Sequence, residues 1–181
     1  SNAVIHFQPL SVLNHIDSDA WAQNRLQAYR GSLRHFLRAL FEDKLWEEGY
    51  QVYDQGYNEL LPYDLLAEGE NDFERVLDYE ERFFVKFTKE MPDQDFLKLV
   101  RTMKEADFTK SHDHWNQFLY GGQLSVLELR SYWTVIDVFG HLYKSSDLDI
   151  DGYWTWRGLA ALLPWEYQPI DRVPIHLKHS E

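Results

Sequence analysis

The sequence predicts an all-α fold, a single-domain helical bundle of about six to seven helices in which any strands are short and terminal, as at residues 4–7. Three observations favour this class. Apolar residues recur at helical spacing in several segments, polar capping residues stand where those segments start, and glycine or proline stands where they end. Hydrophobic residues make up 44% and charged residues 27% of the chain, which is typical of a globular protein.

The first half of the chain predicts three helical segments. Residues 17–19 (Asp-Ser-Asp) favour a cap for a helix that runs to about Arg30. Residues 50–61 continue a helical spacing up to Pro62. Between these two segments, a second helix carries one apolar stripe and is expected to end at Gly49. The residues of that stripe are Leu33, Phe36, Leu37, Leu40, Phe41 and Leu45.

The second half predicts the remaining helices. Residues 71–74 form a partial capping box for a helix with apolar positions from 73 to 87, and another helix starts at residues 92–93. Ser125 and Glu128 form a full capping box for the most apolar helix, expected to be central and to reach Tyr143. A last short helix is expected over residues 153–163, and residues 109–122 read as a loop or a short helix.

Length and composition bound the class of protein. The first three residues look like a scar of tag cleavage, so residues 4–181 are treated as one domain, long enough for a hydrophobic core. Cysteine is absent, no apolar run reaches the roughly 20 residues of a membrane span, and the start lacks the pattern of a signal peptide. We therefore expect a cytoplasmic protein without a disulfide framework.

The net charge of −12 argues against nucleic acid and anionic membranes as partners and favours a basic protein. Aromatic residues make up 16% of the chain, including 7 Trp and 11 Tyr. Tyr and Trp serve cores and protein interfaces alike, because each combines a large apolar area with a polar tip. The composition is therefore that of a surface built to hold a basic protein, although solubility alone also accounts for an acidic charge.

Several residue patterns carry possible metal or acid–base chemistry. Asp147, Asp149 and Asp151, followed by Gly152, match the first half of a calcium-binding loop, but Gly158 stands where the bidentate carboxylate is required. The sequence from His112 to His114 lacks a third ligand nearby. We therefore predict no metal and no cofactor, and read the three aspartates as a polar turn or part of a binding surface.

A second class of function remains open, namely a metal-dependent or acid–base enzyme. Asp137 and His141 lie four residues apart, and Glu80 falls on an apolar helical side. Motifs for a serine nucleophile or a phosphate-binding glycine loop are missing, and a structural hydrogen bond is the simpler reading of the Asp137–His141 pair. We therefore expect no catalytic residues.

Residues 152–163 resemble the C-terminal signature of PoNi-type immunity proteins, bacterial antitoxins that neutralise polymorphic nuclease toxins. The resemblance rests on Gly152-Tyr153-Trp154, on Trp156 and on Ala160-Ala161, while Arg157 stands where the family has Glu. The resemblance implies a helical fold, no catalysis and a toxin as partner.

The sequence therefore predicts an immunity or inhibitor protein that binds a basic toxin, with a generic helical regulatory or scaffold domain as a further alternative. Its mechanism would be electrostatic steering followed by burial of aromatic anchors. The residues expected to contact the partner form two groups. They are Asp147, Asp149, Asp151, Tyr153 and Trp156, and a second acidic strip of Glu47, Glu48 and Asp54.

Overall fold

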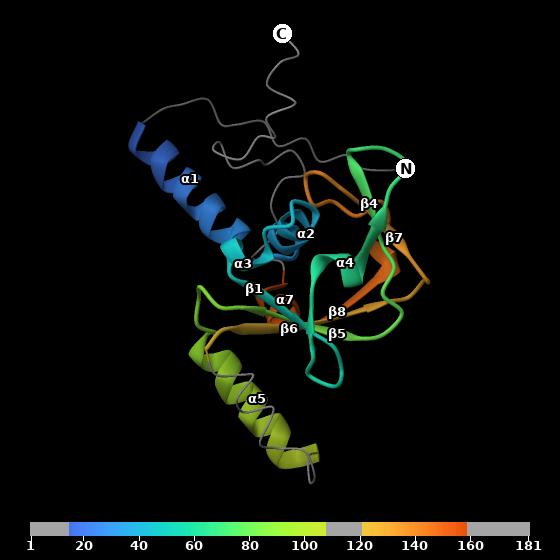
Figure 1. Ribbon diagram of the computed structural model, residues 1–181. Helices are drawn as coiled ribbons and strands as arrows, with labels where there is room; N and C mark the ends of the chain where they lie inside the picture. Colours follow the sequence, from blue (N-terminus) through green and yellow to red (C-terminus); the bar gives the residue numbers. More distant parts are fainter. Residues whose placement is uncertain (1–14, 108–120, 159–181) are drawn as a thin grey trace, which may run out of the picture.

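The computed structural model describes residues 15–107 and 121–158, and it shows a mixed α/β fold with two antiparallel sheets. The prediction of an all-α bundle is therefore wrong. The larger sheet has five strands in the order β2-β1-β5-β6-β8, and the smaller has three in the order β3-β4-β7 (Figure 1). The strands of the larger sheet are β1 (Tyr50–Tyr53), β2 (Glu59–Leu60), β5 (Phe83–Phe87), β6 (Gln123–Leu129) and β8 (Leu148–Gly152). Those of the smaller sheet are β3 (Leu66–Glu68), β4 (Glu74–Leu77) and β7 (Thr134–Asp137).

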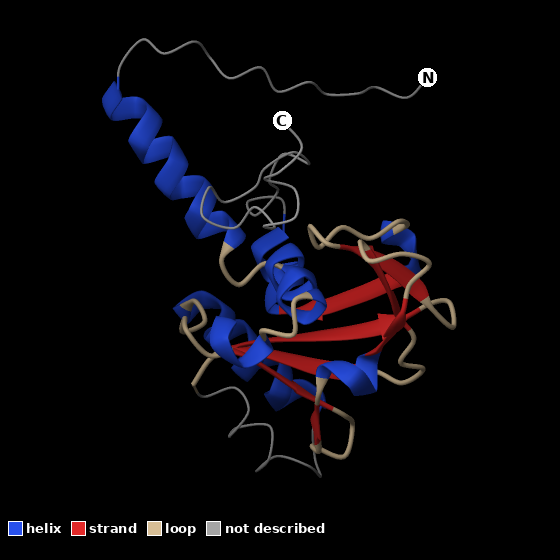
Figure 2. Ribbon diagram, turned by 45° about the horizontal axis from the view of Figure 1, so that its top comes forward, coloured by secondary structure: helices blue, strands red, loops and turns tan. Residues whose placement is uncertain are grey.

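The longer helices differ in how they lie relative to the sheets. Helix α2 lies across the strands and packs on them, whereas α1 and α5 project from the body in different directions (Figures 1 and 2). A short 3-10 turn, η1 (Ser145–Asp147), leads into β8. The helices are α1 (His15–Tyr29), α2 (Leu33–Phe41), α3 (Leu45–Glu48), α4 (Pro62–Leu65), α5 (Gln94–Asp107) and α7 (Tyr153–Arg157).

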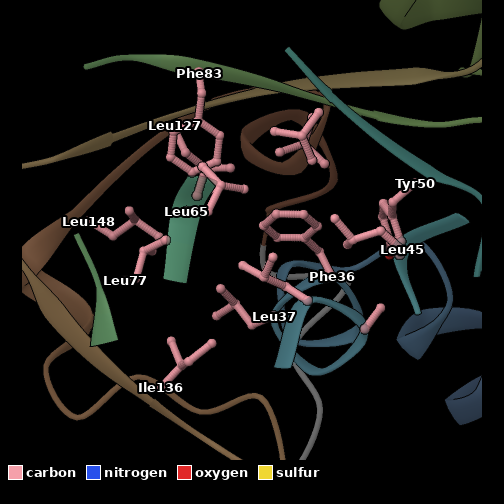
Figure 3. Packing of buried hydrophobic residues seen from close by; sticks show 14 of the residues in the cluster. Phe36, Leu37, Leu45, Tyr50, Leu65, Leu77, Phe83, Leu127, Ile136 and Leu148 are labelled. Carbon is pink, nitrogen blue, oxygen red and sulfur yellow. The ribbon is translucent and has the colours of Figure 1, made fainter. Parts of the chain in front are cut away.

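The core lies where α2 meets both sheets. Phe36 and Leu37 of α2 belong to one buried cluster with Phe83 and Leu127 of the larger sheet and Ile136 of the smaller sheet (Figure 3). Strand residues contribute with the period of two that a pleated strand imposes, so β5 places Phe83, Val85 and Phe87 on the α2 face.

For four of the predicted helices, at least one predicted end agrees with the structure. α1 ends at Tyr29, as expected, but starts at His15, ahead of the proposed cap. The single helix expected from residue 33 to Gly49 is two helices, α2 and α3, with a turn at residues 42–44 between them, and Gly49 ends α3 in the left-handed conformation with φ 84°. α5 begins after Pro92-Asp93, and α7 begins at Tyr153 and ends at Arg157, with the rest of its predicted span outside the described residues. The suggested strand at residues 4–7 also lies outside them.

The other helix predictions were wrong. Residues 50–61 form β1 and β2, residues 73–87 form β4 and β5, and the most apolar segment, residues 125–143, forms most of β6 and all of β7. A nearly continuous apolar run satisfies any period, so it cannot distinguish a buried strand from a buried helix. The supposed cap Ser125 is a residue of β6, and its hydroxyl accepts a hydrogen bond from the Trp154 amide at 3.1 Å.

Candidate protein-binding surface

The three aspartates singled out from the sequence lie on η1 and on the edge strand β8, where they are engaged within the protein. Asp149 pairs with Arg130, whose hydrogen bond holds the pKa of this carboxyl below its ordinary value. The Asp151 carboxylate accepts the Gly152 amide at 2.6 Å, and the Asp147 carbonyl accepts the Arg130 amide at 2.8 Å. These residues therefore stabilise the edge of the sheet, and their carboxylates are less available to a partner.

The two aromatic residues of this group differ in exposure. Tyr153 is buried: its ring packs edge-on against Phe96 at 5.1 Å, and its hydroxyl accepts the Asp93 amide at 3.3 Å. Trp156 is partly exposed and also contacts Phe96. Only Trp156 of this pair presents a large area to solvent.

The neighbouring residues of the same motif hold the N-terminal helix. Trp154 donates its indole N–H to the Gly31 carbonyl at 2.6 Å. Arg157 donates to the carbonyls of Arg30 and Gln27 at the end of α1, at 2.8 and 3.2 Å. A cation at this end of a helix is favoured by the helix dipole. The motif that carries the family resemblance thus joins α1 to the larger sheet, and the helical fold that the resemblance implies is not the fold of this chain.

The second predicted strip, Glu47, Glu48 and Asp54, does not form one surface. Glu47 is exposed, whereas Glu48 is buried and its carboxylate lies 3.1 Å from His35 Nε2. Asp54 closes the β1–β2 turn by accepting the amide and the side chain of Asn58 at 2.8 and 2.7 Å, which lowers its pKa. Burial removes Glu48 from any protein-binding surface.

Glu48, His35 and Tyr50 form a buried polar network. His35 Nδ1 accepts the Gly31 amide at 3.2 Å, so the neutral ring carries its proton on Nε2 and donates it to Glu48. The Tyr50 hydroxyl lies 2.9 Å from His35 Nδ1, and burial raises the pKa of this phenol well above its ordinary value of 10.0. Because all three residues are buried, the network holds α2, α3 and β1 together without presenting a reactive atom to solvent.

The residues considered for acid–base chemistry, Asp137, His141 and Glu80, lie in a turn and a loop of the fold. Asp137 accepts the amides of Phe139 and His141 at 2.8 and 2.9 Å, and its second oxygen lies 3.0 Å from His141 Nδ1, so the pair shapes the turn after β7. Glu80 is exposed in the loop between β4 and β5. Residues 112–114 lie outside the described residues. Across 15–107 and 121–158, no group of three or more His, Asp or Glu residues is placed to hold a metal ion.

A strongly acidic region of the chain is residues 54–81, which we call the acidic segment. It contains ten carboxylates and one arginine, which gives it a net charge of −9 out of −12 for the whole chain. It forms the β1–β2 turn, β2, α4, β3, β4 and the loop that follows β4. Eight of its acids are exposed. They are Glu59, Asp64, Glu68, Glu70, Asp72, Asp78, Glu80 and Glu81.

Exposed aromatic side chains accompany these acids. Tyr63 on α4 is 75% exposed, and Phe73 precedes β4 at 45%. Tyr143 is 63% exposed and donates its hydroxyl to Glu74. Trp133, also exposed, precedes Thr134, which pairs with Leu77 at the end of β4. Acidic and aromatic groups therefore share the region of the smaller sheet.

A hollow of about 250 Å³ lies within this region, between the end of α2, α4 and β3. Leu40, Phe41 and Leu66 give it an apolar floor, and the exposed residues Asp43 and Glu68 also line it. The Arg75 guanidinium lies over the Phe41 ring at 5.0 Å and donates to the Glu74 carbonyl at 2.7 Å. The hollow is thus an apolar depression beside two exposed acids.

The sequence analysis placed only Asp54 of the acidic segment on a partner-binding surface and considered Glu80 only as a possible acid–base residue. The signal that could have identified the segment is the distribution of charge along the chain, since a single arginine accompanies ten acids over residues 54–81. Total charge and short motifs do not reveal that imbalance.

No family model, no curated protein and no solved structure matches this chain. None of the described helices has the length and apolar character needed to cross a membrane.

Proposed function

We propose that this chain is an inhibitor of the immunity-protein kind, which binds and neutralises a basic protein toxin through the acidic segment and the aromatic side chains beside it. The observation that carries the proposal is the concentration of three quarters of the net charge in residues 54–81, next to exposed Tyr63 and Phe73. Such a surface speeds the encounter with a cationic partner and supplies aromatic anchors once contact is made.

The hydrogen bonds within the protein favour the acidic segment, rather than β8, as the surface that binds the partner. Glu68, Glu70 and Asp72 accept no hydrogen bond from any described side chain or amide, whereas Asp149 and Asp151 are both bonded internally. A carboxylate already paired with an internal arginine gains less from a partner's arginine, because forming the new pair requires the old one to break. Within the described part of the chain, Glu68, Glu70 and Asp72 have no such internal bond to break.

The partner is expected to be a protein with a cationic face. Nucleases are the class that the resemblance suggests, and they are basic near the groove that holds nucleic acid. An acidic inhibitor can occupy such a groove by presenting carboxylates where phosphates would lie. Blocking the groove requires no catalytic residue in the inhibitor.

The proposal is tested by co-expressing the chain with the products of its neighbouring genes and measuring the affinity for a protein that co-purifies. The test variant reverses Glu68, Glu70 and Asp72 to Lys. The control variant reverses Glu47, Asp95 and Asp149 to Lys, so that both carry the same net charge with exposed substitutions only.

We expect a basic partner that is toxic when expressed alone. Its affinity should fall at least about 100-fold in the test variant and about tenfold or less in the control, since close charge pairs in an interface contribute more than distant ones. Equal losses in the two variants would show that total charge, not the acidic segment, governs binding. A partner that is not cationic would contradict the proposal itself.

A further inference from the structure

The acidic segment contains an open strand edge. β3 is the outermost strand of the smaller sheet, and no described strand pairs with its other side. The Asp78 amide donates to the Leu65 carbonyl at 3.2 Å, in register with the pairing of Leu66 with Leu77. Because bonded pairs alternate in an antiparallel ladder, the backbone groups of Ala67 face β4 and those of Leu66 and Glu68 face outward.

Three outward groups have no hydrogen-bond partner among residues 15–107 and 121–158. The Leu66 amide bonds to the Pro62 carbonyl, which closes α4. No hydrogen bond from a described residue reaches the Leu66 carbonyl, and none engages the Glu68 amide or carbonyl. Unpaired N–H and C=O groups on an edge strand form a template for an added strand.

The hollow lies beside this edge and has the chemistry for one long cationic side chain. Leu66 and Glu68 line it from β3, on the face that looks toward Phe41. An aliphatic stem fits the apolar floor, and an ammonium group at its end would meet the Glu68 and Asp43 carboxylates. Among the described residues that line the hollow, Arg75 is the one cation, and its guanidinium is turned to the Phe41 ring and the Glu74 carbonyl.

We propose that β3 binds an extended basic segment of the partner protein as an additional strand, with one of its lysine side chains in the hollow. This inference rests on the proposed function and names the chemistry of the contact. Backbone bonds to the β3 edge would supply affinity, and the hollow would select the side chain. We propose a basic segment because residues 54–81, which include β3, carry a net charge of −9.

The test measures binding of a capped pentapeptide, Val-Lys-Val-Lys-Val, to the full chain by NMR titration. Two matched peptides carry N-methyl groups, one at the lysines and one at the valines. Only one edge of an added strand can face β3, so one of these peptides should bind about fivefold more weakly for each bond that it loses, while the other binds like the parent peptide. The amide signal of Glu68 should shift and become protected from exchange.

Two variants probe the protein side. Glu68→Pro removes the outward amide, and Glu68→Gln keeps that amide while removing the same charge; a proline is tolerated at an edge strand whose N–H faces solvent. We expect the parent peptide to bind Glu68→Pro about fivefold more weakly than Glu68→Gln. The N-methylated peptides keep the inference testable should Glu68→Pro fail to fold.

Failure of this inference is distinguishable from failure of the proposed function. Equal binding of both N-methylated peptides, or no binding of the parent peptide, overturns the added strand. The loss of partner affinity in the triple-lysine variant would stand in either case. If the partner instead binds that variant normally, the proposed function fails on its own measurement.

Discussion

Two acid-rich regions of this molecule, β8 with η1 and the acidic segment, use their carboxylates differently. In the first, Asp149 pairs with Arg130, Asp151 accepts its neighbouring amide, and Tyr153 is buried against Phe96. In the second, a single arginine accompanies ten acids, and Tyr63 and Phe73 are exposed. Clustered acids beside aromatics are therefore not sufficient to identify a binding surface, because the partners inside the protein decide how much charge remains for a ligand.

The two regions should differ most in how much the free energy of unfolding changes when a tyrosine is truncated to alanine. Tyr153→Ala removes a buried ring and is expected to lower the free energy of unfolding by about 3–5 kcal/mol. Tyr63→Ala removes an exposed ring and should change it by no more than about 0.5 kcal/mol. Denaturant unfolding of both variants makes the comparison, and similar losses would mean that Tyr63 also belongs to the packed structure.

Two adjacent glutamates offer a second comparison. Glu48→Gln weakens the charge-assisted bond from His35 in a buried network and should cost about 1–3 kcal/mol of stability. Glu47→Gln changes an exposed carboxylate and should cost less than about 0.5 kcal/mol. Thermal and denaturant unfolding would report both, and equal effects would remove the structural role assigned to the network.

The turn after β7 should show a pH-dependent contribution to stability. Partial burial alone would raise the pKa of Asp137, but hydrogen bonds from the side chain and amide of His141 and from the Phe139 amide outweigh it and lower the pKa below its ordinary value of 3.8. The contribution of a depressed carboxyl is complete above the unfolded pKa and disappears as pH falls through the folded one.

Asp137→Asn should therefore lower stability by about 1–2 kcal/mol at pH 7. The difference from the natural protein should stay constant down to about pH 5 and shrink below about pH 4. Urea unfolding at a series of pH values measures it. A difference that grows on acidification would contradict a lowered pKa for the Asp137 carboxyl.

The smallest effect is expected for the exposed ion pair at the sheet edge. Asp149→Asn removes the partner of Arg130, and such exposed ion pairs contribute little to stability, reduced further by salt. Unfolding measured at low and high ionic strength should give nearly the same stability for the variant as for the unsubstituted protein. A loss as large as that of Glu48→Gln would show that this edge is more tightly organised than its exposure suggests.

The sequence analysis predicted best the helix ends that depend on residues close by in the chain. Ser32 accepts the His35 amide at the start of α2, Gly49 closes α3, and Pro92 precedes α5, so the ends of these helices follow from single residues. The strands depend on partners distant in the sequence. Phe83, Phe84 and Val85 are all buried because β5 is a central strand, and an apolar run of that kind carries no period that distinguishes strand from helix.

The proposed binding surface was predictable only in its chemistry. Net charge and aromatic content favoured an acidic surface with exposed rings, and the structure has one. Its location was not predictable from motifs, since Glu48 and Tyr153 look equivalent to Glu47 and Trp156 until packing buries the first two. Exposure is a property of the tertiary structure, whereas the imbalance of charge over residues 54–81 was visible in the chain.

The most direct test of the two regions is amide hydrogen exchange of the chain alone and in complex with its co-purified partner. We expect binding to slow exchange in residues 59–81, with the largest change at the β3–β4 hairpin, and to leave residues 147–156 unchanged. Protection confined to residues 147–156 would contradict this expectation and would return the binding surface to β8 and the start of α7.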